Sequence, residues 1–260
     1  MKKELAVLLL VSLLEFTIAS GCIQQAQQPT KSSILSALDS VNAYTYEFSE
    51  RRTIQNRTYN IHGVVGIDRK TLHFFEFTQM TNENHTFKLW QYFDGSYVYF
   101  KVEDPELNKI GEVSIDELYK NMSKEEFIKM TIKTRDVLAK LKEMLENATI
   151  ISIEKDGTLY KITFELVNHY EKAPTFLETN VENSEVIQDY INMLRRNVTE
   201  NIMGIVWVDS KSLPVKLEVK KHIIEVYPVR NFTVKEFIEY NVTVSYKYGL
   251  PEWVSEVEKK

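Results

Sequence analysis

The sequence predicts an α+β fold that is built around one antiparallel sheet. Apolar and polar residues alternate along many short segments, which is the period of a strand with one buried face. Two turn sequences, Asp94-Gly95 and Lys155-Asp156-Gly157, join neighbouring segments and predict β-hairpins. Three other segments repeat their apolar residues at helical spacing. These observations predict about 10 to 11 strands and two or three helices.

The first half of the domain predicts a short helix and then a meander of strands. Ser32 or Ser33 is the expected cap of a helix that extends to Val41. Five alternating segments with short turns between them predict five antiparallel strands, which begin near Tyr44, Tyr59, Leu72, Phe87 and Tyr97. Residues 104–113 are predicted to form a loop.

The second half predicts two more helices and a further group of strands. A capping-box pattern at 123–126 opens an amphipathic helix predicted over about 124–146. We expect a hairpin over 149–167, a helix over about 184–196, and three closing strands over 202–209, 214–226 and 232–248. Residues 168–183 have the weakest pattern, and both a mobile flap and a long connection agree with it. The charged C-terminal end, 251–260, is expected to fray.

Composition predicts a single domain over residues 32–250 that has no nucleic-acid partner. The 260-residue chain has a formal net charge of −5, and it shows no break in composition within that range. Because Lys and Arg are not in surplus, the chain lacks the basic character that binds phosphate backbones. The single cysteine has no disulfide partner within the chain, so the domain is expected to be held together by its core.

The N-terminal residues resemble a prokaryotic lipoprotein signal. Lys2 and Lys3 precede an uncharged apolar run, Leu5–Leu14, and small residues then lead to Cys22. The resemblance implies a signal peptide over 1–21, cleavage before Cys22, and lipid on its thiol. Residues 22–31, rich in glutamine, are then a flexible tether. The alternative is an uncleaved anchor helix. Both interpretations place the domain outside the cell, on the outer face of the cell membrane.

Sequons for N-glycosylation are more frequent than the Asn, Ser and Thr content predicts by chance. They occur at Asn56, Asn84, Asn121, Asn147, Asn197, Asn231 and Asn241. Some of these motifs also fit strand ends and helix caps. A lipoprotein signal combined with many sequons resembles an archaeal surface lipoprotein, so we expect a glycoprotein whose membrane partner is reached through the lipid on Cys22.

The segment GIVWVDSKSLPVKLE, residues 204–218, resembles the lipoprotein-carrier superfamily of the LolA, LolB and LppX/LprG type. The order of predicted elements over 32–250 is similar as well. The resemblance implies that the antiparallel sheet is curved into a half β-barrel, with the helices covering its concave face around a cavity for acyl chains. Because a soluble shuttle is not lipid-anchored, the anchored members of the superfamily are the better analogues.

No motif for catalysis, a cofactor or a metal is found. The five histidines lack metal-ligand spacing, and the chain has neither a G-x-S-x-G motif nor a glycine-rich phosphate loop. We therefore expect a protein that is not an enzyme. Catalytic carboxylate pairs form in space rather than along the chain, so a surface hydrolase is kept as the least supported alternative.

Aromatic residues gather on the predicted strands and are the candidate lining of a ligand cavity. A sheet with large apolar residues on both faces is either covered on both or offers one for binding. The candidates are Phe74, Phe75, Phe77, Trp90, Tyr92, Tyr97, Tyr99 and Trp207. The sequence thus predicts a binding protein for a lipid or another apolar ligand. The alternative is a ligand-free interaction or sensor module that contacts an envelope protein through the sheet or through 168–183.

Overall fold

The computed structural model describes residues 28–82, 85–118, 123–172 and 194–258. Five helices lie in these residues, namely α2 (Lys31–Ser40), α3 (Ile115–Leu118), α4 (Lys124–Arg135), α5 (Val137–Asn147) and α7 (Val254–Glu258). The strands are β1 (Ala43–Ile54), β2 (Arg57–Asp68), β3 (His73–Thr81), β4 (Thr86–Phe93), β5 (Tyr97–Glu103), β6 (Asn108–Ser114), β7 (Thr149–Asp156), β8 (Leu159–Lys172), β9 (Arg196–Val208), β10 (Pro214–Tyr227) and β11 (Phe232–Ser245).

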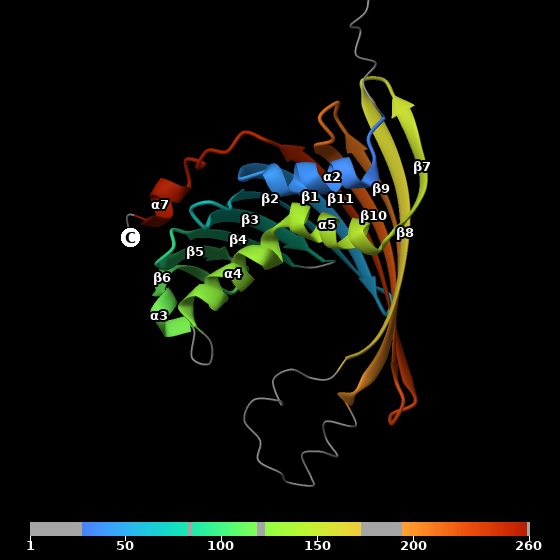
Figure 1. The fold of residues 1–260 in the computed structure, drawn as a ribbon. Coiled ribbons are helices and arrows are strands. Elements are labelled where there is room, and N and C mark those ends of the chain that lie inside the picture. Colours follow the sequence, from blue (N-terminus) through green and yellow to red (C-terminus); the bar gives the residue numbers. More distant parts are fainter. Residues whose placement is uncertain (1–27, 83–84, 119–122, 173–193, 259–260) are drawn as a thin grey trace, which may run out of the picture.

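All eleven strands form one antiparallel sheet in the order β6-β5-β4-β3-β2-β1-β11-β10-β9-β8-β7. Strands that follow one another in sequence pair, except β6 and β7, and the additional pairing of β1 with β11 joins the two ends of the domain. The sheet is strongly curved but does not close, so β6 and β7 remain its edges (Figure 1). The predicted antiparallel sheet and its strand number are confirmed. The expected hairpins are present too, with Gly95 and Gly157 at positive φ in their turns.

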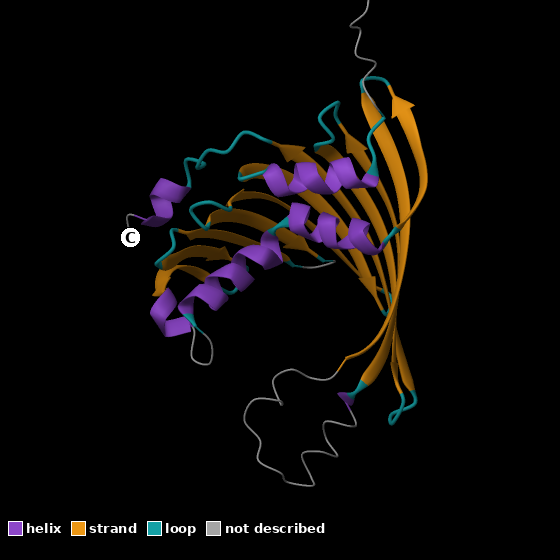
Figure 2. Ribbon diagram, viewed as in Figure 1, coloured by secondary structure: helices purple, strands orange, loops and turns teal. Residues whose placement is uncertain are grey.

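The main core lies between one face of the sheet and the helices α2 and α5. Alternate residues of the strands point toward it, including Tyr44 and Ile67, which are both fully buried. Helix α2 contributes Ile34 and Leu38, and α5 contributes Leu138, Leu141 and Leu145 at helical spacing. Figure 2 shows α2, α4 and α5 as a row of helices along this side of the sheet.

A second, smaller core lies on the opposite face and involves the C-terminal helix. Val254 and Val257 of α7 are 2% and 4% exposed and pack with Phe75 and Tyr92. Trp253 meets the Phe75 ring edge-on at 6.2 Å. The expectation that the chain frays after Pro251 is therefore wrong up to residue 258, because these apolar side chains cover an otherwise exposed aromatic patch.

The Val257→Asp substitution is expected to detach α7, because its carboxylate would be desolvated against Phe75 and Tyr92. The free energy of unfolding should fall by about 2 kcal/mol, the typical contribution of one buried apolar side chain. Urea titration measures this change, and tryptophan emission should shift to longer wavelength as Trp253 becomes hydrated. Ser255→Asp places the same charge on the exposed side of α7. If Ser255→Asp lowers the free energy of unfolding as much as Val257→Asp does, the loss of stability does not come from detachment of α7.

Four strand glycines each face a phenylalanine on the neighbouring strand. The cross-strand pairs are Phe48 with Gly63, Phe75 with Gly66, Phe100 with Gly111, and Phe164 with Gly204. A Cβ atom built on any of these glycines would lie within 3 Å of its phenylalanine ring. Each ring therefore occupies the space that the glycine leaves open, as in known aromatic–glycine pairs of β-sheets.

The structure also corrects several predicted element boundaries. The single helix expected over 124–146 is two helices, because Asp136 is non-helical and caps both of them. The expected loop 104–113 contains β6, and the cap of the first helix is Thr30 rather than Ser32 or Ser33. The helix expected over 184–196 falls largely outside the described residues, and Arg196 begins β9.

Candidate functional site

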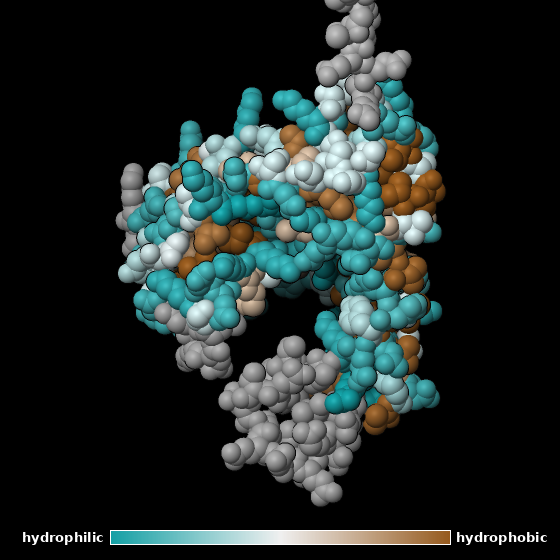
Figure 3. Space-filling view, viewed as in Figure 1, coloured by the Kyte–Doolittle hydropathy of each residue, from teal (hydrophilic) through white to brown (hydrophobic). Residues whose placement is uncertain are grey.

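A cavity of about 560 Å³ lies where α4 and α5 pass over the sheet. It is lined from the sheet by residues of β1, β2, β3 and β8–β11, and from the helices by residues between Thr134 and Asn147. In the space-filling view the molecule is hollowed below α4 and α5, and hydrophilic side chains lie above and to the right of the opening (Figure 3).

The floor of the cavity is apolar. The strands β8–β11 contribute Leu166, Ile202, Leu217, Val219, Ile238 and Tyr240. Ile202 and Leu217 are only 4% and 2% exposed, which shows that this surface continues the main core outward. Because side chains alternate along a strand, one row from each strand forms the floor, and the residues between point to the other face of the sheet.

The rim of the cavity is charged. On the same face of β1, β9 and β10, apolar residues near the helices give way to charged residues farther out, for example Val219 to Lys221 on β10. The rim includes Glu50 and Arg52 on β1, which are joined by an ion pair of 2.8 Å. An apolar floor with a charged rim suits an amphipathic molecule better than a purely polar or purely apolar one.

A buried ion pair holds the helices over the cavity. Asp136, between α4 and α5, accepts hydrogen bonds from Arg69 Nε and Nη2 at 2.6 and 2.7 Å. The same carboxylate accepts a hydrogen bond from the Tyr44 hydroxyl at 2.9 Å. Arg69 also donates to the carbonyls of Leu38 and Val41 at the end of α2. The Arg69 guanidinium therefore connects both α2 and the α4–α5 junction to the sheet.

Contacts of Arg135 fix the end of α4 at the cavity wall. Arg135 forms an ion pair with Glu76 at 2.8 Å and donates to Gln91 at 2.9 Å, and its guanidinium lies 4.2 Å from the Phe74 ring centroid. The Tyr46 hydroxyl donates to the Arg135 carbonyl at 2.7 Å. Burial raises the pKa of Tyr46, so the phenol remains a neutral hydrogen-bond donor.

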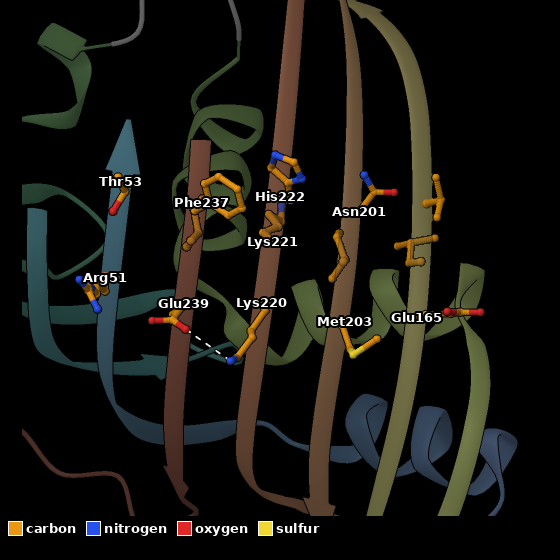
Figure 4. A pocket seen from close by; sticks show the side chains of 14 residues that line it. Arg51, Thr53, Glu165, Asn201, Met203, Lys220, Lys221, His222, Phe237 and Glu239 are labelled. Carbon is orange, nitrogen blue, oxygen red and sulfur yellow. Dashed lines mark ion pairs between the residues drawn. The ribbon is translucent and has the colours of Figure 1, made fainter. Parts of the chain in front are cut away.

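A second depression lies on the other face of the sheet, away from the helices. It has a volume of about 510 Å³ and crosses β8, β9, β10, β11 and β1 (Figure 4). Val167, Met203 and Phe237 line it and are more than half exposed. Lys220 and Glu239 form an ion pair of 3.4 Å within it. We call it the outer groove, and the space under α4 and α5 the inner cavity.

None of the eight aromatic residues predicted to line a cavity lies among the lining residues of the inner cavity. Phe74 belongs to the main core, and Phe75, Tyr92 and Tyr99 lie in or against the small core under α7. The others line neither the inner cavity nor the outer groove.

The remaining predicted aromatics make local contacts. Phe77 and Trp90 pair with ring centroids 5.1 Å apart, and Tyr97 lies against Tyr99 at 6.0 Å. Trp207 donates to Asp156 at 2.9 Å. A ligand role for these residues stays a prediction. The inner cavity is lined instead by side chains of β8–β11 that sequence reasoning missed. The change from apolar to polar or charged residues along one face of β8, β9 and β10 was the available signal.

The predicted modification sites are only partly within the described residues. Cys22, Asn84 and Asn121 lie outside them. The other sequon asparagines, at 56, 147, 197, 231 and 241, are all exposed, as an acceptor side chain must be. Their glycosylation stays a prediction.

Within the described residues, no group of three or more His, Cys, Asp or Glu side chains is arranged to hold a metal ion. The helices that the structure describes include none with the length and apolar character of a membrane span.

Comparison with known proteins gives only distant likenesses. No protein-family model matches the sequence. No curated protein matches it either. Among solved structures, a DUF1329 family protein from Desulfovibrio piger is similar over 89% of this chain and 100% of its own, with 10% identity and a TM-score of 0.26. A beta-barrel-like protein of domain of unknown function DUF1849 from Brucella abortus is similar over 79% of this chain and 98% of its own, with 10% identity and a TM-score of 0.23.

Proposed function

We propose that this protein is a lipid-anchored, extracytoplasmic binding protein that holds a lipid or lipidated molecule in the inner cavity. The observation that carries the proposal is the cavity itself, with an apolar floor on β8–β11 and a roof made by α4 and α5. Its volume of about 560 Å³ falls within the range of roughly 300–1,000 Å³ that is typical of small-molecule sites.

In this proposal the curved sheet acts as a half barrel whose concave face α2, α4 and α5 cover, as the resemblance to the lipoprotein-carrier superfamily implies. Burial of an acyl chain on Leu166, Ile202 and Ile238 would supply the binding energy, at about 25 cal/mol for each Å² of apolar surface removed from water. No catalytic step, cofactor or metal is part of the proposal.

The anchor is the second part of the proposal. Lipid on Cys22 would hold the domain at the outer face of the membrane, and stable anchoring takes two acyl chains. The inner cavity would then lie within reach of the membrane that supplies its ligand. The exposed sequon asparagines are in keeping with a domain outside the cell.

A matched pair of substitutions tests which depression binds the ligand. Met144 on α5 lines only the inner cavity, and Met203 on β9 lines only the outer groove. The Met144→Trp substitution is expected to fill part of the inner cavity and to lower the ratio of lipid-bound to lipid-free chains about tenfold, which corresponds to about 1.4 kcal/mol. Met203→Trp should leave that ratio unchanged. Native mass spectrometry of the full chain, released from detergent, measures the bound fraction directly.

The outer groove supports a second candidate function, an interaction module that contacts an envelope protein through the sheet. Its exposed side chains Val167, Met203 and Phe237 form the kind of patch that marks interaction surfaces. If the wild-type chain carries no noncovalent lipid, the binding proposal is wrong and the interaction module is favoured. If lipid is present but only Met203→Trp removes it, the ligand site is the outer groove.

A further inference from the structure

We propose that the ligand of the inner cavity is an amphiphile with an anionic head, and that Lys140 binds this head. The inference rests on the proposed function of the inner cavity and specifies its ligand class. The structure favours an anion over a cation because of how the charges around the cavity are paired.

The carboxylates that line the cavity are already paired with cations. The pairs are Glu50 with Arg52 at 2.8 Å, Glu76 with Arg135 at 2.8 Å, Glu143 with Lys133 at 2.7 Å, and Glu200 with Lys221 at 3.7 Å. A cationic head that paired with one of these carboxylates would lie beside a basic side chain of the protein and be repelled by it. This repulsion disfavours cationic ligands.

Lys140 differs from the other basic side chains that line the cavity. Among the residues that the structure describes, its ammonium has no carboxylate within ion-pair distance, and its hydrogen bond is donated to the Thr134 carbonyl at the end of α4. An ammonium has three N–H donors, so two stay available for a ligand. Lys140 also lies at the rim, on the first turn of α5, where a head group can stay hydrated while the chain below it is buried.

The electrostatic surroundings of Lys140 also favour an anion. Partial desolvation of the ammonium, followed by the positive charges of Arg135 and Lys221, lowers the pKa of Lys140, although Asp136 and Glu76 act in the opposite direction. Two neighbouring cations thus repel the Lys140 charge. An anion placed among these three side chains would relieve this repulsion and gain charge-assisted hydrogen bonds.

The apolar part of the ligand would then extend from Lys140 along the floor. Lys140 on α5 and Leu166 and Ile202 on the sheet line the same cavity, the first at its charged rim and the others at its apolar floor. A single-chain carboxylate such as a fatty acid has this combination of one charge and one apolar chain, and so do lipids with a phosphate head. The ligand class is therefore defined by its anionic group rather than by its chain.

A competition between two matched ligands tests the inference. The full chain is incubated at neutral pH with an equimolar mixture of hexadecanoate and methyl hexadecanoate, which differ in the negative charge. Native mass spectrometry counts the two complexes. We expect the wild-type chain to prefer hexadecanoate about tenfold, the effect of one hydrogen bond to a charged group. Lys140→Met should remove the preference, and Lys140→Arg should keep it. Lys129→Met is the control, because Lys129 is an exposed α4 lysine paired with Glu125.

The outcomes separate this inference from the proposed function. If the wild-type chain binds both ligands equally, or if Lys140→Met keeps the preference, the role of Lys140 is wrong while the cavity still binds apolar chains. If the wild-type chain binds neither ligand, the proposed function fails and the inference fails with it. Retained binding of methyl hexadecanoate by Lys140→Met shows that the substitution leaves the cavity folded. A phosphate-headed lipid in place of hexadecanoate then distinguishes the two anionic head groups.

Discussion

Replacing Asp136 by asparagine is expected to lower the free energy of unfolding by about 3–5 kcal/mol, the usual cost of breaking a buried ion pair. The substituted side chain would still accept the cap hydrogen bond from the Ala139 amide, because asparagine is as good a helix cap as aspartate. The loss would therefore come from Arg69, whose guanidinium would remain beneath the helices without its counter-charge. The Asp136 side chain is only 6% exposed, so water cannot replace the missing charge efficiently.

Urea denaturation of the wild-type and variant chains measures this effect. The control is Asp39→Asn, which breaks an ion pair between α2 and Lys142 of α5. That pair joins two helices of the same layer but is largely exposed, so its loss should have a much smaller effect. Equal destabilisation by the two substitutions would show that the Arg69–Asp136 pair has no special role. The double variant Arg69→Met/Asp136→Leu should recover much of the loss, because it leaves no unpaired buried charge.

The stability of the Asp136 variant should also depend less on pH. Burial raises the pKa of Asp136, but the hydrogen bonds and charge of Arg69 and the other donors outweigh this, so its folded-state pKa lies below the ordinary value. A lowered folded-state pKa contributes stability above the unfolded-state pKa of about 4, and this contribution is lost as the pH falls through the folded-state pKa. The difference in the free energy of unfolding between the wild type and Asp136→Asn should therefore shrink below about pH 4. Thermal denaturation at several pH values measures this difference.

Much of the fold could be predicted from the sequence because the sheet is built from local signals. Alternation locates the strands, and Asp94-Gly95 and Lys155-Asp156-Gly157 mark two of the hairpins, so neighbours in sequence become neighbours in the sheet. The pairing of β1 with β11 has no such local signal. It follows from the curvature of the whole sheet and from the packing of Tyr44 and Val242 into one core.

The break in the long helix could not be predicted from periodicity alone. Apolar residues continue at helical spacing through 124–146, and aspartate is tolerated inside helices. What ends α4 at Asp136 is a tertiary contact, because Arg69 and Tyr44 lie far away in the sequence. Such contacts are visible only once the sheet places β1 and β2 beneath the helices.

The residues that line the inner cavity could not be predicted from the sequence for a related reason. Aromatic content predicts a lining on β3–β5, where Phe75 packs under α7 and Trp90 packs against Phe77. The cavity is instead under α4 and α5, where the strands contribute ordinary aliphatic residues such as Ile202 and Ile238. Whether an apolar face is filled or hollow depends on what covers it, and the sequence of a strand does not contain that information.

Replacing Gly204 by valine is expected to destabilise the protein by about 3 kcal/mol, the upper end of the usual cost of overpacking a core. A Cβ atom at this position would lie 2.1 Å from Cζ of Phe164, and that ring is fully buried in the main core. Gly204 and Phe164 are direct cross-strand partners, so the clash cannot be relieved without moving β8 away from β9. The ring has no alternative space, because Ile162 and Val206 beside it are buried as well.

A double variant shows whether the pair, rather than glycine itself, is responsible. Phe164→Leu alone should lower the free energy of unfolding, because packing is lost. The double variant Phe164→Leu/Gly204→Val should be destabilised by less than the sum of the two single substitutions, with a coupling of about 0.5–3 kcal/mol. Urea denaturation of the four chains gives this coupling. Gly249→Val is the control, since a Cβ atom there meets no atom within 4 Å. If Gly204→Val is no more harmful than Gly249→Val, or if the two core substitutions are additive, the phenylalanine–glycine pair does not determine how closely β8 and β9 pack. A measured coupling would extend to the three other strand glycines, because each of them faces a phenylalanine in the same register.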